Sequence, residues 1–366
     1  MKPISLVAAI ASALTLYSAA SVAQTKITYG SWAPSSDPAS LGMKAFTAEV
    51  GKRSGGKIQV VNHFDSSVVQ MRTVLNGIRD SLVDAGYIAG AIYQAELPID
   101  SMITSYASIQ ANPLSISAAV TDFVLNDCPE CRAEVAKRGV TALAYAGTPP
   151  FYLMCKAPVT DFSQVKGKSI RAASAYLRFV RYIGATPVNT PTVEVMEAMR
   201  RGQVACLVGS IFWLQAYSLW DVVKYVVDVS MGQYNNGLVF GVNTAFWKKL
   251  NAADRAAIVG ALPTLVVQAA AAGNAKAQSI RKTATEKGIV WAKPNEKMAA
   301  TIQKWFAGER KNIEDFGKKK GIANAGAILD RFEASVAKWN GIVSKAGGDA
   351  AAVQAALTKE VYAKMK

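Results

Sequence analysis

The spacing of apolar and polar positions predicts alternating strands and helices in the first ninety residues. Residues 26–32 form the first expected strand, and a helix follows with apolar positions at Leu41, Met43, Phe46 and Val50. The run "KIQVVNHF" predicts a second strand, residues 68–82 a helix, and "VDAGYIAG" a short buried strand. This order, strand-helix-strand-helix-strand, is typical of a parallel sheet flanked by helices.

The same order returns in the middle of the chain. Residues 169–174 predict a strand, 175–183 a helix, and 203–210 another buried strand after a helix with apolar Val193, Met196 and Met199. Residues 75–89 and 196–210 resemble each other in pattern, although few residues are identical. We therefore expect two similar α/β lobes. Open α/β sheets bind ligands beyond the carboxyl ends of their strands, so two facing lobes would share one cleft.

The last third of the chain is mainly helical in pattern. A long alanine-rich helix is expected from Asn251 or Ala252 to about Lys287, long enough to bridge both lobes. Two amphipathic helices follow at 296–316 and 325–345. The expected first lobe comprises residues 24–150 with about 236–270. The expected second lobe comprises residues 151–235 with about 271–366, including the C-terminal helices.

The N-terminus predicts export. Lys2, an apolar run at 4–16 and the small residues of 21–23 form a signal-peptide pattern, with cleavage near Ala23. Gln24 stands where a lipoprotein would need a cysteine, and the apolar run is too short for a stable membrane span. We expect a periplasmic protein without direct membrane insertion.

Charge and motifs narrow the functional classes. The formal net charge of +15 suits anionic partners, but export argues against nucleic acid. His63 is the single histidine, which leaves little for a Ser-His-Asp or Cys-His centre. The acidic residues show no metal-binding spacing, and "KGKS" at 166–169 lacks the glycine of a phosphate loop. No cofactor, metal or catalytic residue is expected.

Four cysteines in an exported chain favour disulfides, and they permit three pairings. Cys128 and Cys131 have the spacing of redox motifs and precede a helical pattern. A thiol-disulfide enzyme using these two residues is therefore one alternative, beside a purely structural cross-link.

Arg171 is the candidate anion-binding residue. It ends the short strand of "KGKSIRAAS" and is followed by small residues, which leave room for a planar anion. A guanidinium binds a carboxylate through two parallel hydrogen bonds. The carboxylate could belong to a ligand or to an acidic side chain of the protein.

The order of several segments resembles the DctP-type family, the periplasmic substrate-binding proteins of TRAP transporters. These segments are "GGKIQVV", "GIRDSLVDAGYI", "VKGKSIRAAS", "YIGATPV", "TVEVMEAMRRGQV" and "NTAFWKKLNAADRAAI". The resemblance covers about residues 25–320. It implies the two-lobed, hinged periplasmic-binding-protein fold and closure on a small organic acid. It also implies delivery to membrane permease subunits that an ion gradient drives.

The resemblance implies that Arg171 holds the carboxylate of the ligand, but two helpers of the family differ here. A ligand-contacting asparagine is replaced at Gly209, and a second arginine is replaced at or near Tyr152. These changes suggest a ligand with fewer anionic groups, held partly by aromatic side chains, and disfavour sialic acid or a simple dicarboxylate. The aromatic candidates for the ligand walls, besides Tyr152, are Trp32, Tyr87, Trp213 and Tyr234.

The resemblance to this family also favours one disulfide pairing and ranks the alternative functions. Cys155 and Cys206 fall on strands expected to be neighbours in the second lobe, so a Cys155–Cys206 disulfide is the preferred pairing. Cys128 and Cys131 would then pair with each other or stay free. A binding protein that serves a sensor or another transporter class is the first alternative function, and the thiol-disulfide enzyme is the second.

Overall fold

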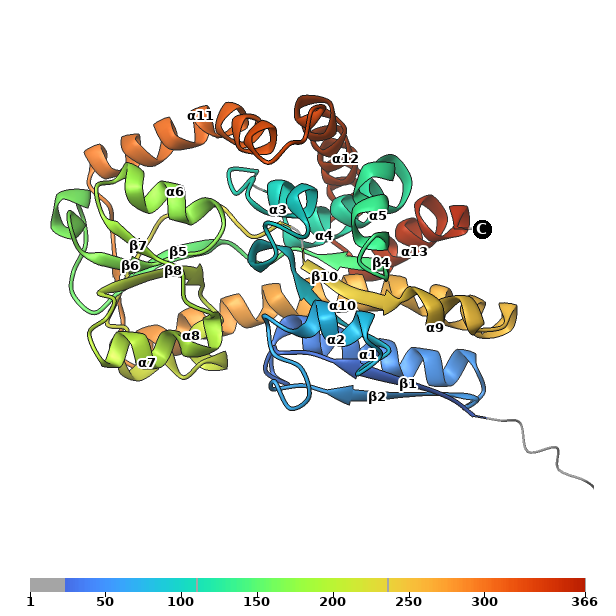
Figure 1. The fold of residues 1–366 in the computed structure, drawn as a ribbon. Coiled ribbons are helices and arrows are strands. Elements are labelled where there is room, and N and C mark those ends of the chain that lie inside the picture. Colours follow the sequence, from blue (N-terminus) through green and yellow to red (C-terminus); the bar gives the residue numbers. More distant parts are fainter. Residues whose placement is uncertain (1–23, 110, 236, 366) are drawn as a thin grey trace, which may run out of the picture.

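The computed structural model describes residues 24–109, 111–235 and 237–365, and the expected signal peptide at 1–23 lies outside them. The described chain forms two α/β lobes, each built on one sheet with helices around it, as Figure 1 shows. This confirms the fold class that the sequence pattern and the family resemblance predict.

The first lobe is built on a five-stranded sheet with the strand order β2-β1-β3-β10-β4. Its strands are β1 (Thr25–Gly30), β2 (Ile58–His63), β3 (Ala85–Ala89), β4 (Val140–Ala146) and β10 (Gly237–Asn243). β1 pairs in parallel with β2 and β3, whereas β10 runs antiparallel to β3 and β4. β10 therefore returns the chain from the second lobe into the middle of the first sheet.

The second lobe is built on a six-stranded sheet with the order β11-β9-β5-β8-β6-β7. Its strands are β5 (Phe151–Cys155), β6 (Ser169–Arg171), β7 (Thr186–Val188), β8 (Cys206–Ser210), β9 (Tyr225–Val227) and β11 (Val290–Ala292). β6 pairs in parallel with β7 and β8, and β5 runs antiparallel to β8. The amino end of β5 and the carboxyl ends of β6 and β8 thus meet at one edge.

Helices cover the sheets and begin where the sequence supplies capping residues. Asp37 caps α1 with Pro38 at its first position, and Asn251 caps the long α10. The helix expected at 68–82 is shorter than predicted. A turn at Gln70 precedes α2, and Ser81, with φ of 62°, ends the helical segment. The helices are α1 (Pro38–Arg53), α2 (Val74–Arg79), α3 (Pro98–Thr104), α4 (Pro113–Asp122), α5 (Pro129–Ala136), α6 (Ala175–Tyr182), α7 (Val195–Arg200), α8 (Trp213–Ala216), α9 (Thr244–Lys249), α10 (Ala252–Glu286), α11 (Glu296–Lys319), α12 (Ala325–Lys345) and α13 (Ala350–Glu360).

Each lobe has its own apolar core. The first core includes not only the first sheet but also Phe332 and Trp339 of α12 and Leu357 of α13. The expected division grouped the C-terminal helices with the second lobe, whereas α12 and α13 contribute to the first core. Their apolar faces pack on the first lobe, where α12 contacts α4.

Two helices connect the lobes. α10 packs its first half in the first core and Ile280 and Ala284 in the second, which confirms the expected bridging helix. α11 also spans both cores, with Met298 and Trp305 in the second and Ile313 in the first.

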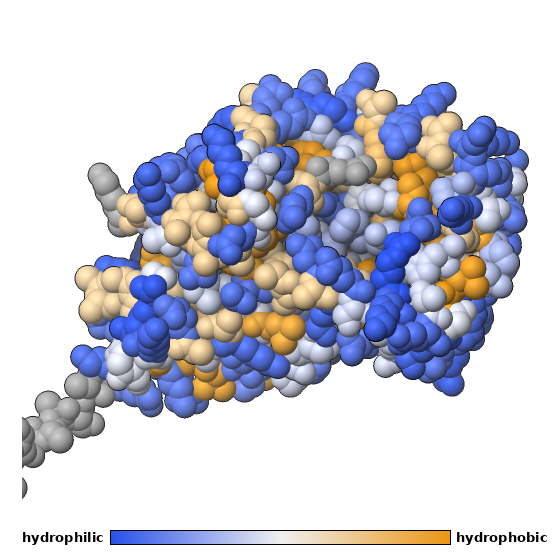
Figure 2. Space-filling view, turned by 180° about the vertical axis from the view of Figure 1, so that it is seen from behind, coloured by the Kyte–Doolittle hydropathy of each residue, from blue (hydrophilic) through white to orange (hydrophobic). Residues whose placement is uncertain are grey.

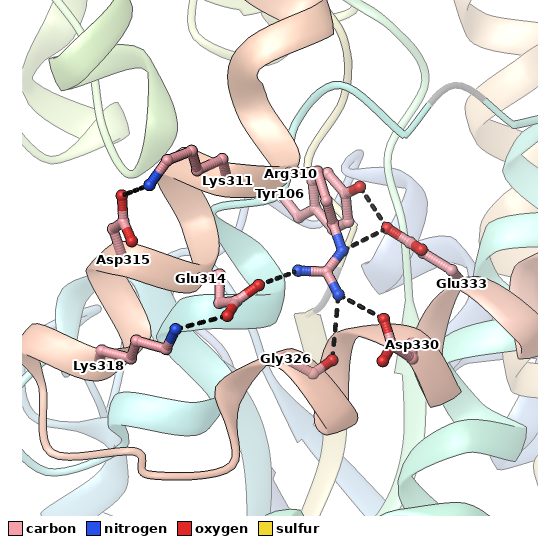
Figure 3. Close-up of polar contacts among 9 residues, drawn as sticks. All are labelled: Tyr106, Arg310, Lys311, Glu314, Asp315, Lys318, Gly326, Asp330 and Glu333. Atoms are coloured by element: carbon pink, nitrogen blue, oxygen red, sulfur yellow. Dashed lines mark hydrogen bonds and ion pairs between the residues drawn. The ribbon is translucent and has the colours of Figure 1, made fainter.

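A polar network attaches α11 to the first lobe (Figure 3). Arg310 Nε lies 3.0 Å from Glu333 of α12, and its Nη2 donates to the carbonyl of Gly326 at 3.1 Å. The hydroxyl of Tyr106, which follows α3, donates to the same Glu333 carboxylate. The carboxylate of the preceding residue, Glu309, forms an ion pair with Arg178 of α6 in the second lobe. α11 is thus fixed to both lobes at neighbouring residues.

α10 is the one helix of the described residues that is long and apolar enough to cross a membrane. Its apolar residues pack inside the protein, because Ile258 to Ala270 contribute to the first core and Ile280 to the second. On the face shown in Figure 2, apolar residues lie in small groups separated by hydrophilic ones. The length of α10 therefore reflects its bridging position between two cores.

Both disulfides join cysteines that are close in space. Cys155 and Cys206 stand opposite each other on β5 and β8, with a Cα–Cα distance of 4.1 Å, and they are bonded. This confirms the preferred pairing. Cys128 and Cys131, whose state the sequence leaves open, are bonded to each other at the start of α5.

A candidate ligand pocket between the lobes

A cavity lies between the lobes, beyond the carboxyl ends of β1, β3, β6 and β8. The space open to the centre of a water molecule is about 90 Å³, several times what one water needs. Trp32, Asp37 and Tyr87 line it from the first lobe, and Arg171 and Trp213 from the second. Sheets of this kind place ligands at this edge, as the sequence predicts.

Arg171 enters the cavity from the end of β6. Its side chain is only 3% exposed, and its Nε donates to the carbonyl oxygen of Thr190 at 2.9 Å. Its Nη2 donates to Oγ1 of Thr192 at 3.1 Å. These two contacts fix the plane of the guanidinium, because they hold two of its three nitrogens.

The charge of Arg171 has no ion-pair partner among the described residues. No carboxylate in that part of the chain lies within 4.0 Å of the guanidinium, and Nη1 makes no hydrogen bond there. Burial lowers the pKa of Arg171 to about 10, because the low-dielectric interior disfavours the charged form. The guanidinium carbon also lies 5.1 Å from the centre of the Trp213 ring. A fixed, buried and unpaired guanidinium is suited to receive an anion.

Asp37 faces the cavity from the first lobe. Its Oδ1 accepts the backbone N–H of Ala39 at 2.9 Å, which is the N-cap bond of α1. Burial raises the pKa of Asp37 to about 6, while that N–H and the charge of Lys276 act in the opposite direction. Asp37 and Arg171 are the only Asp, Glu, Lys or Arg residues in the described lining of the cavity.

Aromatic rings form most of the remaining wall. Trp32 stacks on Tyr87 with ring centres 4.9 Å apart, and its Nε1 donates to the carbonyl of Tyr87 at 3.1 Å. On the second lobe, Phe151 stacks on Tyr176 and meets the edge of Trp213, both at 5.3 Å. Tyr217 and Tyr234 complete the aromatic lining. Such walls give apolar contact, while one or two polar groups fix the orientation of a ligand.

Gly209 stands behind the wall instead of lining it. A Cβ at this position would lie 2.2 Å from the ring of Trp213. The indole therefore occupies the space into which a longer side chain at position 209 would extend. The family resemblance implies an asparagine at this position, and here the ring of Trp213 fills the space beside the glycine.

Tyr152 is also outside the cavity. Successive residues of a strand point to opposite faces, and Phe151 is the member of the pair that turns toward the pocket. The ring of Tyr152 instead meets Trp291 edge-on at 5.7 Å, beside Arg281. Tyr152, which the sequence predicts as part of the ligand wall, therefore does not line this cavity, because the phase of the strand turns it to the opposite face.

Comparison with known proteins decides the family. The family model described as "Bacterial extracellular solute-binding protein, family 7" matches residues 29–312. The chain belongs to this family.

Three solved structures of similar fold have 17%, 19% and 20% sequence identity to this chain. A Bordetella pertussis extracytoplasmic solute receptor that binds pyroglutamic acid has a TM-score of 0.73 at 20% identity, covering 84% of this chain and 99% of its own. A marine metagenome TRAP protein, in complex with 3-hydroxybenzoate, has a TM-score of 0.76 at 17% identity (86% and 99% covered). A Bordetella bronchiseptica TRAP protein with bound mandelate has a TM-score of 0.73 at 19% identity, with the same coverage. These receptors share the fold of this family 7 protein.

The sequence did not indicate every residue of the pocket in this family 7 protein. Asp37 has a sufficient local explanation as a helix cap, so nothing in the pattern points to a second role. Tyr217 follows no strand end that the pattern marks, and Tyr176 falls in the first turn of the helix expected at 175–183, where an aromatic residue is explained by packing. By contrast, the expected Arg171, Trp32, Tyr87, Trp213 and Tyr234 all line the cavity.

Proposed function

We propose that this family 7 receptor binds one small organic acid in the cavity, with the carboxylate of the acid on Arg171. The observation that carries the proposal is the buried guanidinium, held by two threonines and without a carboxylate partner among the described residues. A bound carboxylate would supply the missing countercharge and accept hydrogen bonds from Nη1 and Nη2.

The walls favour an acid with a compact, flat body. Trp32, Tyr87, Phe151 and Trp213 offer ring faces and edges. Only about 90 Å³ is open to the centre of a water molecule, so the ligand must be a small molecule. Pyroglutamic acid, 3-hydroxybenzoate and mandelate, which similar receptors bind, each combine one carboxylate with one ring. We therefore propose a monocarboxylate with a single ring or a body of that size.

The biological role follows from the family. We propose that the protein works in the periplasm after cleavage of its signal peptide and delivers the acid to a TRAP-type permease. The two connecting helices and the paired segments between the lobes suit a hinge, since Phe151 N–H bonds to Gly232 and Thr148 N–H to Tyr234. Ligand would favour the closed form, which the permease recognises.

A binding protein without catalytic activity also accounts best for the buried, bonded state of Cys128 and Cys131. Cys128 and Cys131 are bonded and buried, with exposed fractions of 0% and 4%. Thiol-disulfide exchange requires a sulfur that another thiolate can reach. We propose a structural role for this pair. Insulin reduction that is lost on Cys128→Ser would overturn it.

The proposed function is tested by a thermal-shift screen. The protein is unfolded, dialysed and refolded to remove any bound molecule, then heated with monocarboxylates, dicarboxylates and neutral ring compounds of matched size. We expect stabilisation by ring monocarboxylates, and none by their amides. Stabilisation by amides equal to that by acids would contradict a carboxylate anchor.

A further inference from the structure

Asp37 presents a free carboxylate oxygen to the cavity. Its side chain is 93% buried, and Oδ1 is engaged by the N–H of Ala39. Oδ2 accepts no hydrogen bond from any residue in the described part of the chain. Oδ2 is not one of the fully enclosed, unpartnered side-chain atoms of the described residues, so it is open to the cavity, where the donor group of a bound molecule can reach it.

The surroundings of Asp37 do not supply that donor. Lys276 of α10 is the cation that acts on it, but Lys276 Nζ bonds instead to Gln215 at 3.3 Å. Burial raises the pKa values of Tyr29, Tyr87 and Tyr217, and the charge of Asp37 adds to the rise. The hydroxyl of Tyr29 donates to the carbonyl of Val239.

The cavity therefore has one charged group on each lobe. Among the described residues, Asp37 and Arg171 form no ion pair within 4.0 Å. Burial raises the pKa of Tyr217, the charge of Asp37 adds to the rise, and the charge of Arg171 opposes it. A ligand carboxylate on Arg171 would share this small space with a second carboxylate. Two like charges at low dielectric repel strongly unless a donor lies between them.

We propose that Asp37 selects acids that carry an N–H group on the carbon next to the carboxylate, and that its Oδ2 accepts this N–H. The ligand then spans the closed cleft, with its carboxylate on Arg171 of one lobe and its nitrogen on Asp37 of the other. This inference rests on the proposed function. Burial raises the pKa of Asp37 to about 6, and an N–H of the ligand on Oδ2 would act against this rise.

The test compares three five-membered rings of the same size by titration calorimetry. L-Proline carries a charged N–H, pyroglutamate a neutral lactam N–H, and cyclopentanecarboxylate none. We expect the wild-type protein to bind at least one of the two nitrogen acids ten or more times more tightly than cyclopentanecarboxylate. Equal affinity for all three would overturn the inference.

Asp37→Asn is the decisive variant, because asparagine is as good a helix cap as aspartate and keeps the size of the side chain. It should reduce the preference for L-proline over cyclopentanecarboxylate at least tenfold, and should improve binding of cyclopentanecarboxylate. Because the single oxygen of asparagine caps Ala39, its NH2 group takes the place of Oδ2, so the affinity for both L-proline and pyroglutamate should fall. Asp80→Asn, at an exposed ion pair with Arg79, is the matched control and should change no affinity.

The outcomes separate the two claims. Acid binding that is lost on Arg171→Met but keeps the same preference in Asp37→Asn would overturn the role of Asp37 alone. Failure of all carboxylates to bind the refolded wild-type protein would overturn the proposed function, and this inference with it.

Discussion

Replacing Arg171 by methionine should have opposite effects on the unliganded fold and on ligand binding. In the unliganded protein, the fall in the pKa of Arg171 from 12.5 to about 10 corresponds to about 3 kcal/mol that the buried charge costs. Methionine removes this cost but also two hydrogen bonds, each contributing about 1 kcal/mol. The free energy of unfolding should stay unchanged or rise by about 1 kcal/mol.

Ligand binding should suffer strongly from the same change. Removing one partner of a buried charge pair costs about 3–5 kcal/mol, so the affinity for a carboxylate should fall at least about 100-fold. Chemical denaturation of ligand-free protein measures the first effect, and calorimetry with the best acid of the screen measures the second.

Arg178 provides a matched control, because it is a second arginine of the same lobe with a carboxylate partner. Its Nη2 contacts Glu309, which is fully buried. Arg178→Met should therefore destabilise the protein by about 3 kcal/mol, since it leaves a buried carboxylate unpaired. The reasoning would be refuted if Arg171→Met destabilised the protein as much as Arg178→Met and kept its acid affinity within tenfold.

Three further predictions follow from the geometry. Gly209→Ala should weaken acid binding at least tenfold, because the added Cβ pushes the ring of Trp213 toward the cavity. The control is Gly341→Ala, whose added Cβ meets no atom within 4 Å and should leave the affinities measured by calorimetry unchanged. Replacing the Cys155–Cys206 disulfide by alanines should cost about 4 kcal/mol in denaturant unfolding, against about 2 kcal/mol for Cys128–Cys131, because it closes the longer loop; equal losses would contradict this. Burial raises the pKa of Glu134 to about 7, so the folded state binds the proton more tightly and stability falls as pH rises from 4.5 to 7. Glu134→Gln should reduce the difference in unfolding free energy between pH 5 and pH 7.5 by about 2 kcal/mol, and an unchanged difference would argue against that proton.

The sequence could predict features that local pattern and chain order determine. The repeated strand-helix order predicts two lobes, and the end of a short strand places Arg171 at the cleft. The pairing of Cys155 with Cys206 follows once the two strands are neighbours. These predictions hold because strand periodicity and parallel crossover fix which chain ends meet.

Other features depend on contacts between distant segments. The phase of β5 decides that Phe151 and not Tyr152 enters the cavity, and only pairing with β8 sets that phase. The C-terminal helices pack on the first lobe because the apolar face of α12 meets α4, which lies some two hundred residues earlier in the chain. Asp37 has a complete local role as a cap, so its second, unpaired oxygen becomes visible only in the folded cavity.

The most direct test of the carboxylate anchor is the crystal structure of the receptor with the acid that stabilises it most. The account predicts one ligand between the lobes, with a carboxylate oxygen within hydrogen-bond distance of Nη1 or Nη2 of Arg171 and a ring against Trp32 or Trp213. A ligand that binds elsewhere, or that turns an uncharged group toward Arg171, would contradict it.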